Sequence, residues 1–441
     1  MINSLLIKNG TVVSSAGRVQ ADVFIQNGRI LRIAPNLSDK AERVIDAAGL
    51  FVIPGALDPH VHFREPGHTH KEDLHTGSMA CAAGGVTSFF DMPNNSPSIT
   101  TPELMAEKKK VAASKCVVNY NFFIGATPTN AHEMDTIKNI CGIKVFMGCS
   151  TGGLLVDKEE DLEKLFSTGS HIIAVHAEDN HILHENEKRF SSGTIQFEDH
   201  SKIRDARAAL TATQRSVRLA LKYKRRLHIM HVTSAEEIEF LRAYKDNPLI
   251  SAEVCVQHLM LSSPDIYKKL GGFAKMNPPI RDAHHAPVLW QGLKDGVLKW
   301  VATDHAPHTK EEKSVKVYGD CPSGMPGVET SMALMLDQVN RGSITLEQVV
   351  LWMCENPVKH YSVVNKGKVA EGYDADVALV DLNKKKVVRG AEMFTKVKWS
   401  PYEGMELQGW PVMTLVGGQV VFENGIVNES VRGTEIQIGE K

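Results

Sequence analysis

The feature that most constrains the fold of this chain is an eightfold alternation of apolar runs with helical stretches. Between residues 51 and 307, eight runs rich in β-branched and aromatic residues follow this rhythm, which is typical of parallel strands joined by crossover helices. The runs are FVIPGALDPHVH, GVTSFFDMP, VVNYNFFIG, GIKVFMG, HIIAVHAED, RLHIMHV, LISAEVCVQH and LKWVATDHAP. Eight strands in this order predict an α/β fold, a closed (β/α)8 TIM barrel.

The two ends of the chain have a different pattern. SLLIKNGTVV and ADVFIQNGRI alternate apolar and polar positions between Gly and Asn turns, as half-buried antiparallel strands do. DADVALVDL and MTLVGGQVVFENGIV repeat this pattern near the C-terminus. We therefore expect a small β-sandwich built from residues 1–52 and 361–441, with the barrel in residues 53–360.

Composition and charge narrow the range of partners. The chain has 441 residues, 42% of them hydrophobic, and a formal net charge of −2, which offers no basic face for nucleic acid or anionic lipid. Its seven cysteines include no C-x-x-C pair, which favours reduced thiols in a cytoplasmic protein. MINSLLIKNGTVV is too short an apolar run for a leader or a membrane span. We expect a small-molecule substrate, no nucleic-acid or membrane partner, and a homodimer.

Polar residues stand where the predicted strands end. In barrels of this type the active site lies at the carboxyl ends of the strands. A polar residue at any one strand end can simply begin a loop, but chance does not explain ligand-type residues on so many strands. These residues are His60 and His62, Asp91 to Asn94, Lys144, His176, His231, His258, Asp304 and His308.

Several of these residues are typical metal ligands. His60 and His62 are two positions apart, so both imidazoles project from one face of a strand. With His176, His231 and Asp304 they are too many for one tetrahedral zinc, which favours two cations about 3.5–4 Å apart. A charged Lys144 beside them is disfavoured. Its neutral amine could react with carbon dioxide to give a bridging carbamate, or the lysine could extend its stem to the surface.

With these residues assembled, the chain resembles the amidohydrolase superfamily, and most closely its dihydroorotases. The resemblance covers nearly the whole chain and rests on motifs in the family's order: PGALDPHVHFREPG, GGVTSFFDMPN, GIKVFMG, VHAED, HVTSAE, KMNPPIRD, TDHAPH, GMPGVET and EGYDADVALVDL. It implies two metal ions, usually zinc. The implied ligands are His60, His62 and Asp304 for the first metal and His176 and His231 for the second, with N6-carboxylated Lys144 as the bridge.

The resemblance also implies the reaction and the substrate contacts. Dihydroorotases reversibly close N-carbamoyl-L-aspartate to (S)-dihydroorotate in pyrimidine biosynthesis, and Asp304 would act as general base and then general acid. A guanidinium, amides and an imidazole suit a carboxylate. The implied substrate residues are Arg64, Asn94, Asn277 and His308, together with the backbone at Pro326 and Gly327, which would contact the ring amide.

Two alternatives remain open. An allantoinase or hydantoinase would share the metal ligands and the lysine, but Arg64 and Asn277 argue against a ring that lacks a carboxylate. A catalytically inactive scaffold would share the fold, although every implied ligand is present. The polar segment 306–324 is interpreted either as a lid over the substrate or as a surface loop.

Overall fold

Eight parallel strands form the centre of the molecule. The computed structural model describes residues 3–148, 153–191 and 193–439. The strands are hydrogen-bonded in sequence order, and the bridge between Val61 and His305 brings the last strand back to the first. They are β8 (Ala56–Val61), β9 (Val86–Asp91), β10 (Asn119–Gly125), β11 (Gly142–Phe146), β12 (Ile173–His176), β13 (Leu227–Ile229), β14 (Ile250–Cys255) and β15 (Trp300–Ala302). The predicted barrel is confirmed.

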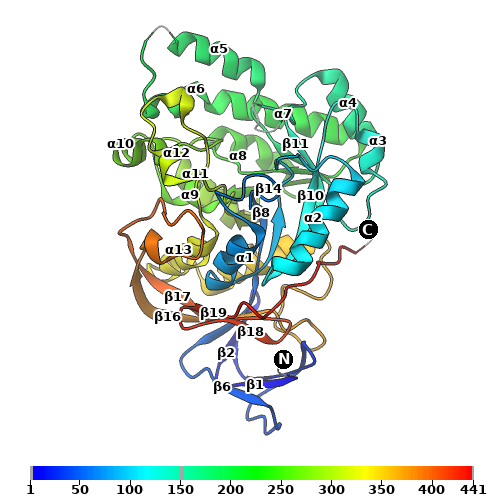
Figure 1. Cartoon of the computed structure of the whole chain (residues 1–441), viewed down its shortest axis with the longest axis vertical. Helices are drawn as coiled ribbons and strands as arrows, with labels where there is room; N and C mark the ends of the chain where they lie inside the picture. Colours follow the sequence, from blue (N-terminus) through cyan, green and yellow to red (C-terminus); the bar gives the residue numbers. More distant parts are fainter. Residues whose placement is uncertain (1–2, 149–152, 192, 440–441) are drawn as a thin grey trace.

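Helices surround this barrel, as Figure 1 shows. Because both faces of the sheet are covered, every residue of β8 to β15 is buried, which explains apolar runs without polar alternation. The helices are α1 (Leu74–Ala83), α2 (Pro102–Lys115), α3 (Ala131–Met134), α4 (Glu159–Ser167), α5 (Asn180–Phe190), α6 (His200–Ile203), α7 (Ala206–Tyr223), α8 (Ala235–Leu241), α9 (Val256–Met260), α10 (Asp265–Leu270), α11 (His285–Lys294), α12 (Lys310–Lys313), α13 (Val328–Asn340), α14 (Leu346–Val350) and α15 (Asn356–His360).

A β-sandwich from both ends of the chain lies below the barrel in Figure 1. One sheet has the order β5-β4-β1-β6 and the other β19-β18-β17-β16-β7-β2-β3, and their apolar faces share one core that includes Leu5, Val23, Leu379 and Leu415. The strands are β1 (Ser4–Lys8), β2 (Thr11–Ser14), β3 (Gly17–Gln20), β4 (Asp22–Gln26), β5 (Arg29–Ala34), β6 (Arg43–Asp46), β7 (Phe51–Pro54), β16 (Val377–Val387), β17 (Glu406–Val416), β18 (Gln419–Glu423) and β19 (Ile426–Val427).

Two details of the strands differ from the sequence analysis. β1 pairs with β6, and β2 with β7, in parallel, because the chain crosses the sandwich between them instead of turning back in a hairpin. The run FVIPGALDPHVH also forms two strands, since β7 belongs to the sandwich and β8 to the barrel. The chain changes sheets at Gly55, where a Cβ atom would lie 2.1 Å from the Thr87 hydroxyl oxygen.

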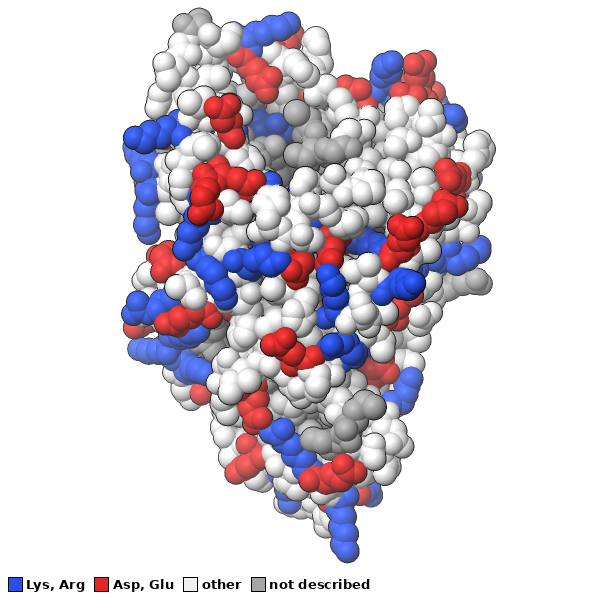
Figure 2. Space-filling model, in the orientation of Figure 1, with Lys and Arg blue, Asp and Glu red and all other residues white. Residues whose placement is uncertain are grey.

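Acidic and basic side chains are interspersed on the face of the molecule drawn in Figure 2. Neither charge dominates that face, in keeping with the net charge of −2. Within the described part of the chain, no helix combines the length and the apolar character needed to cross a membrane.

Candidate active site

The carboxyl ends of the barrel strands surround a cavity of about 190 Å³. All the metal ligands and substrate residues implied by the family resemblance line it except Pro326 and Gly327, so residues far apart in the chain meet at one place. The lining residues are His60, His62, Arg64, Asn94, Lys144, Phe146, His176, His231, Asn277, Asp304, Ala306, His308, Pro322, Ser323 and Gly324.

The first group of possible metal ligands joins the two ends of the barrel sheet. Asp304 follows β15, and its Oδ1 lies 3.3 Å from His60 Nε2 and 2.9 Å from His62 Nε2. One ligand atom from each of the three residues lies within 4.8 Å of the other two. Burial alone would raise the pKa of Asp304, but the two imidazoles and Lys144 outweigh it and lower that pKa to about 2. Asp304 is therefore an ionised carboxylate between two imidazoles.

The second group lies on the neighbouring strands. His176 Nδ1 and His231 Nε2 are 2.9 Å apart, the distance of a hydrogen bond between the two rings. Lys144, at 1% exposure, extends from β11 into the same cavity. Its Nζ donates to Met230 Sδ at 2.8 Å and lies 4.9 Å from the centre of the Phe146 ring. Burial lowers the pKa of Lys144 to about 8, so a neutral amine is accessible there.

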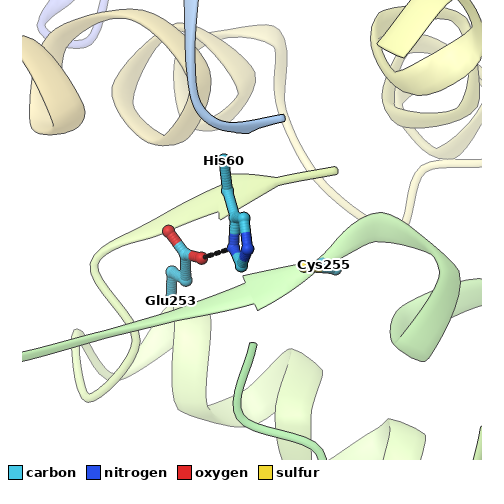
Figure 3. A group of neighbouring side chains, drawn as sticks. All are labelled: His60, Glu253 and Cys255. Atoms are coloured by element: carbon cyan, nitrogen blue, oxygen red, sulfur yellow. Dashed lines mark hydrogen bonds and ion pairs between the residues drawn. The ribbon is translucent and has the colours of Figure 1, made fainter. Parts of the chain in front are cut away.

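Glu253, which was not predicted from the sequence, orients His60. Figure 3 shows its carboxylate facing the imidazole, and His60 Nδ1 donates to Glu253 Oε1 at 2.7 Å. Trp300 Nε1 donates to the other carboxylate oxygen at 2.7 Å. The only sequence signal was a charged residue inside the apolar run LISAEVCVQH, which is rare without a buried partner. Because Nδ1 carries the proton, the lone pair of His60 Nε2 faces the cavity.

The same arrangement holds at two other imidazoles. His176 Nε2 donates to Glu178 Oε2 at 2.7 Å, and Arg204 pairs with this carboxylate. His62 Nδ1 donates to Asn94 Oδ1 at 2.6 Å. Asn94, which is predicted to contact the substrate, therefore also fixes the orientation and tautomer of the His62 ring. Glu178 was missed as well, although it stands two positions after His176 in VHAED. Such partners fix the tautomer of metal-binding histidines.

Three residues of the cavity have left-handed backbone conformations. The φ angles are 62° at Arg64, 36° at His231 and 47° at Asp304, a region that side-chain-bearing residues rarely adopt. Strain of this kind persists where the surrounding structure determines the backbone, and it is common at active sites. The strand ends are thus held so that these three side chains enter the cavity.

The donor atoms of this cavity fit divalent metal ions. His60 Nε2 is buried and has no hydrogen-bond partner among the described residues. The tautomers set by Glu253, Asn94 and Glu178 turn imidazole lone pairs toward the Asp304 carboxylate and the His231 ring. Imidazole nitrogens and a carboxylate are preferred ligands of zinc and of other divalent transition metals. The cavity therefore offers the ligands of a metal centre.

Polar groups for a ligand line the other side of the cavity. Arg64 Nε donates to the Pro307 carbonyl at 3.1 Å, while its NH2 lies 3.2 Å from His308 Nε2. Asn277 Oδ1 is buried without a hydrogen-bond partner among the described residues. Glu65 pairs with Lys115 and not with Arg64, so the guanidinium is not part of a surface ion pair.

Several residues singled out from the sequence lie elsewhere, among them Asp91, which pairs with Lys108 Nζ at 2.5 Å. Pro326 and Gly327 line a separate small space beside His305, and the Gly327 amide donates to His305 Nδ1 at 3.0 Å. Their proposed contact with a ring amide stays a prediction. His258 is in α9 and not at a strand end, and its Nε2 donates to the Pro278 carbonyl at 3.1 Å.

The segment 306–324 covers one side of the cavity through Pro322, Ser323 and Gly324. It is not a uniform loop, because it contains α12 and a 3-10 turn at Tyr318–Asp320. The Lys313 ammonium, almost fully buried, donates at 2.8 Å both to the Lys275 carbonyl and to the Pro322 carbonyl. The segment is thus attached to the barrel, and its movement as a lid stays a prediction.

Exchanging Glu253 for glutamine is expected to weaken metal binding by about 10–100-fold. The amide keeps the size of the side chain but not the charge that holds the proton on His60 Nδ1. Bound metal after dialysis against graded chelator measures the effect, and circular dichroism checks the fold. Glu347→Gln, which alters an ion pair with Arg18 remote from the cavity, is the control. Equal metal retention in both variants would contradict the prediction.

Comparisons with known proteins agree with this geometry. The model of the amidohydrolase family matches residues 51–421. A curated dihydroorotase of Methanosarcina acetivorans is 35% identical, over 96% of this chain and 92% of its own length. One of Streptococcus thermophilus is 36% identical, over 95% of this chain and 100% of its own. The solved L-hydantoinase (dihydropyrimidinase) of Arthrobacter aurescens superposes with a TM-score of 0.93 at 29% identity and covers 99% of this chain and 100% of its own.

Proposed function

The chain belongs to the amidohydrolase family, and within it we infer the dihydroorotase reaction, the reversible closure of N-carbamoyl-L-aspartate to (S)-dihydroorotate. In the closing direction the carbamoyl nitrogen joins the side-chain carboxyl carbon, and water leaves. The single observation that carries this choice is the buried guanidinium of Arg64 on the wall of the cavity that holds the candidate metal ligands. Full-length relatives named as dihydroorotases support it.

The proposed metal centre holds two divalent cations, with zinc as the proposed metal. His60, His62 and Asp304 would hold one cation, and His176 and His231 the other. Lys144 lies between the groups as a buried amine, and the proposal is that its nitrogen bonds to carbon dioxide, loses a proton and becomes an anionic bridge. Two such cations would supply a nucleophilic hydroxide at neutral pH and polarise the ring amide carbonyl.

The residues of the chain supply the proton transfers. Asp304 is ionised and lies beside the reacting end of the cavity, so its carboxylate can accept a proton from the attacking water. It then delivers that proton to the ring nitrogen as the amide bond breaks. Ring closure uses the same carboxylate in the reverse order.

The ring carboxylate of dihydroorotate distinguishes it from the uncharged rings that other amidohydrolases hydrolyse. Arg64 and His308 lie together on the cavity wall and, with Asn277, would hold the substrate carboxylate. A hydantoinase reaction fits less well, although hydantoinases are close in structure, because a ring without a carboxylate would leave the buried Arg64 charge unpaired. An inactive scaffold fits less well because every proposed ligand lines the cavity.

Location and assembly belong to the proposal too. The six described cysteines are free and buried, which supports a reducing, cytoplasmic location. A homodimer is proposed only because closed dimers are common among soluble enzymes.

Turnover of three rings tests the proposed function. We expect zinc-loaded protein, prepared with bicarbonate, to hydrolyse dihydroorotate in strong preference to allantoin and dihydrouracil. Arg64→Met should lower kcat/KM for dihydroorotate by an amount equal to a loss of about 2–5 kcal/mol in transition-state stabilisation, because the substrate carboxylate loses its buried partner. The variant should change turnover of the uncharged rings much less. Preference for an uncharged ring would reject the assignment, and no turnover at full metal content would favour a scaffold.

A further inference from the structure

Lys71 reaches the cavity wall from the segment between β8 and α1, and it belongs neither to the proposed metal ligands nor to the proposed substrate contacts. Its side chain is 14% exposed, and its Nζ lies 3.0 Å from His308 Nδ1 and 2.9 Å from Glu312 Oε1. Glu312 is fixed in turn, because its other carboxylate oxygen accepts the Thr309 amide at 2.9 Å. Lys71 is thereby held between a carboxylate and the outer nitrogen of an imidazole that lines the cavity.

The contact with Lys71 decides where His308 carries its proton. An ammonium group can only donate, so His308 Nδ1 must be the acceptor. A neutral imidazole has one acceptor nitrogen, and the proton therefore lies on Nε2. Burial and the charges of Arg64 and Lys71 lower the pKa of His308 far below its usual range, which keeps the ring neutral. The Ser323 carbonyl, 3.1 Å from Nε2, accepts from this N–H.

In this tautomer the contact between His308 and Arg64 is not a hydrogen bond. Arg64 NH2 lies 3.2 Å from His308 Nε2, but a guanidinium N–H and an imidazole N–H are both donors and cannot bond to each other. In the free protein the Ser323 carbonyl accepts from the His308 N–H, but a ligand oxygen placed beside Arg64 can share this N–H and accept from both residues. A carboxylate, with two oxygens and several lone pairs, has this geometry.

We propose that Lys71 is a positioning residue of the carboxylate-binding site, which holds His308 in its Nε2–H tautomer so that His308 and Arg64 donate together to the substrate carboxylate. This rests on the proposed function and deepens it. The charged groups that face Lys71 and His308 are Arg64, Lys313 and Glu312, with His70 on the far side of Glu312. Without Lys71 the Nδ1 atom would lie 3.6 Å from the Glu312 carboxylate, which favours a proton on Nδ1. His308 would then turn a lone pair toward the substrate.

The first experiment reads the tautomer directly. Protein labelled with 15N-histidine is compared as wild type, Lys71→Met and Lys71→Arg by two-bond 1H–15N correlation near pH 8, with His308→Gln to assign the signal. We expect a protonated Nε2 in wild type and in Lys71→Arg, and a substantial Nδ1–H population in Lys71→Met. An unchanged tautomer in Lys71→Met would overturn the proposal. This readout needs no substrate, so it stands apart from any failure of the proposed function.

The second experiment separates binding from chemistry. We expect Lys71→Met to raise KM for dihydroorotate about tenfold with kcat little changed, the loss expected for one charge-assisted hydrogen bond, and Lys71→Arg to recover most of it. Lys109→Met is the matched control, since the Lys109 side chain is 19% exposed, close to the 14% of Lys71, and pairs with Glu435 at 2.6 Å at a place remote from the cavity. Equal KM in Lys71→Met and wild type, or equal effects of both methionine variants, would reject a role in positioning.

Discussion

Replacing Asp304 with asparagine is expected to lower kcat for dihydroorotate by about 10²–10⁴-fold, the range of general acid–base catalysis. Asparagine keeps an oxygen that can face a metal but has no carboxylate to accept and return the proton. The carboxylate is ionised in the free protein, because the His60 and His62 imidazoles and Lys144 lower the pKa of Asp304 to about 2. Steady-state kinetics in both directions measure the loss.

Metal content decides what that loss means. Because Asp304 lies within 3.3 Å of both imidazoles, weaker metal binding could by itself reduce the rate. Metal analysis of the same samples separates the two causes, and kcat and kcat/KM should fall together at full occupancy. Asp295→Asn, at a partly exposed carboxylate paired with Arg242, is the control. A rate within tenfold of wild type at full occupancy would remove Asp304 from the proton transfers.

Replacing Lys144 with methionine should weaken metal binding by more than about 10²-fold, a larger effect than loss of an outer partner of a ligand. It should also abolish turnover. Methionine fills the same space between Phe146 and Met230 but cannot form a carbamate. Metal titration with and without bicarbonate measures the loss, and only wild type should respond to bicarbonate. Full metal binding in Lys144→Met would contradict the bridging role.

Stability of the metal-free protein gives an independent check on Lys144. Its ammonium is buried beside Phe146 and Met230, so Lys144→Met should leave the melting temperature equal or higher. Lys108 is the matched control, because this equally buried lysine pairs with Asp91 at 2.5 Å. Lys108→Met should destabilise the protein, since it leaves a buried carboxylate unpaired.

Hydrophobic patterning accounts for the parts of the fold that were predictable. β8 to β15 are buried on both faces, so their sequences are largely apolar runs, whereas a sandwich strand such as β5 leaves several residues exposed to solvent. The pairing of β1 with β6 was not predictable in this way, because parallel neighbours are separated by intervening chain and no turn motif marks them.

The sequence by itself determined the barrel and the residues that line its cavity. Strand ends meet at one face of such a barrel, so His60, Lys144, His176 and Asp304 could be placed together from local pattern alone. Their roles were implied by motifs that each occupy a few neighbouring positions, such as DPHVH and TDHAPH.

Only the tertiary structure decided which side chains orient those residues. Glu253 meets His60 across 193 positions, and Lys71 meets His308 across 237. The local sequence around a glutamate inside a strand, or around a lysine in a loop, does not indicate which distant residue it will contact. Such contacts arise when the barrel closes and burial makes every charged group require one.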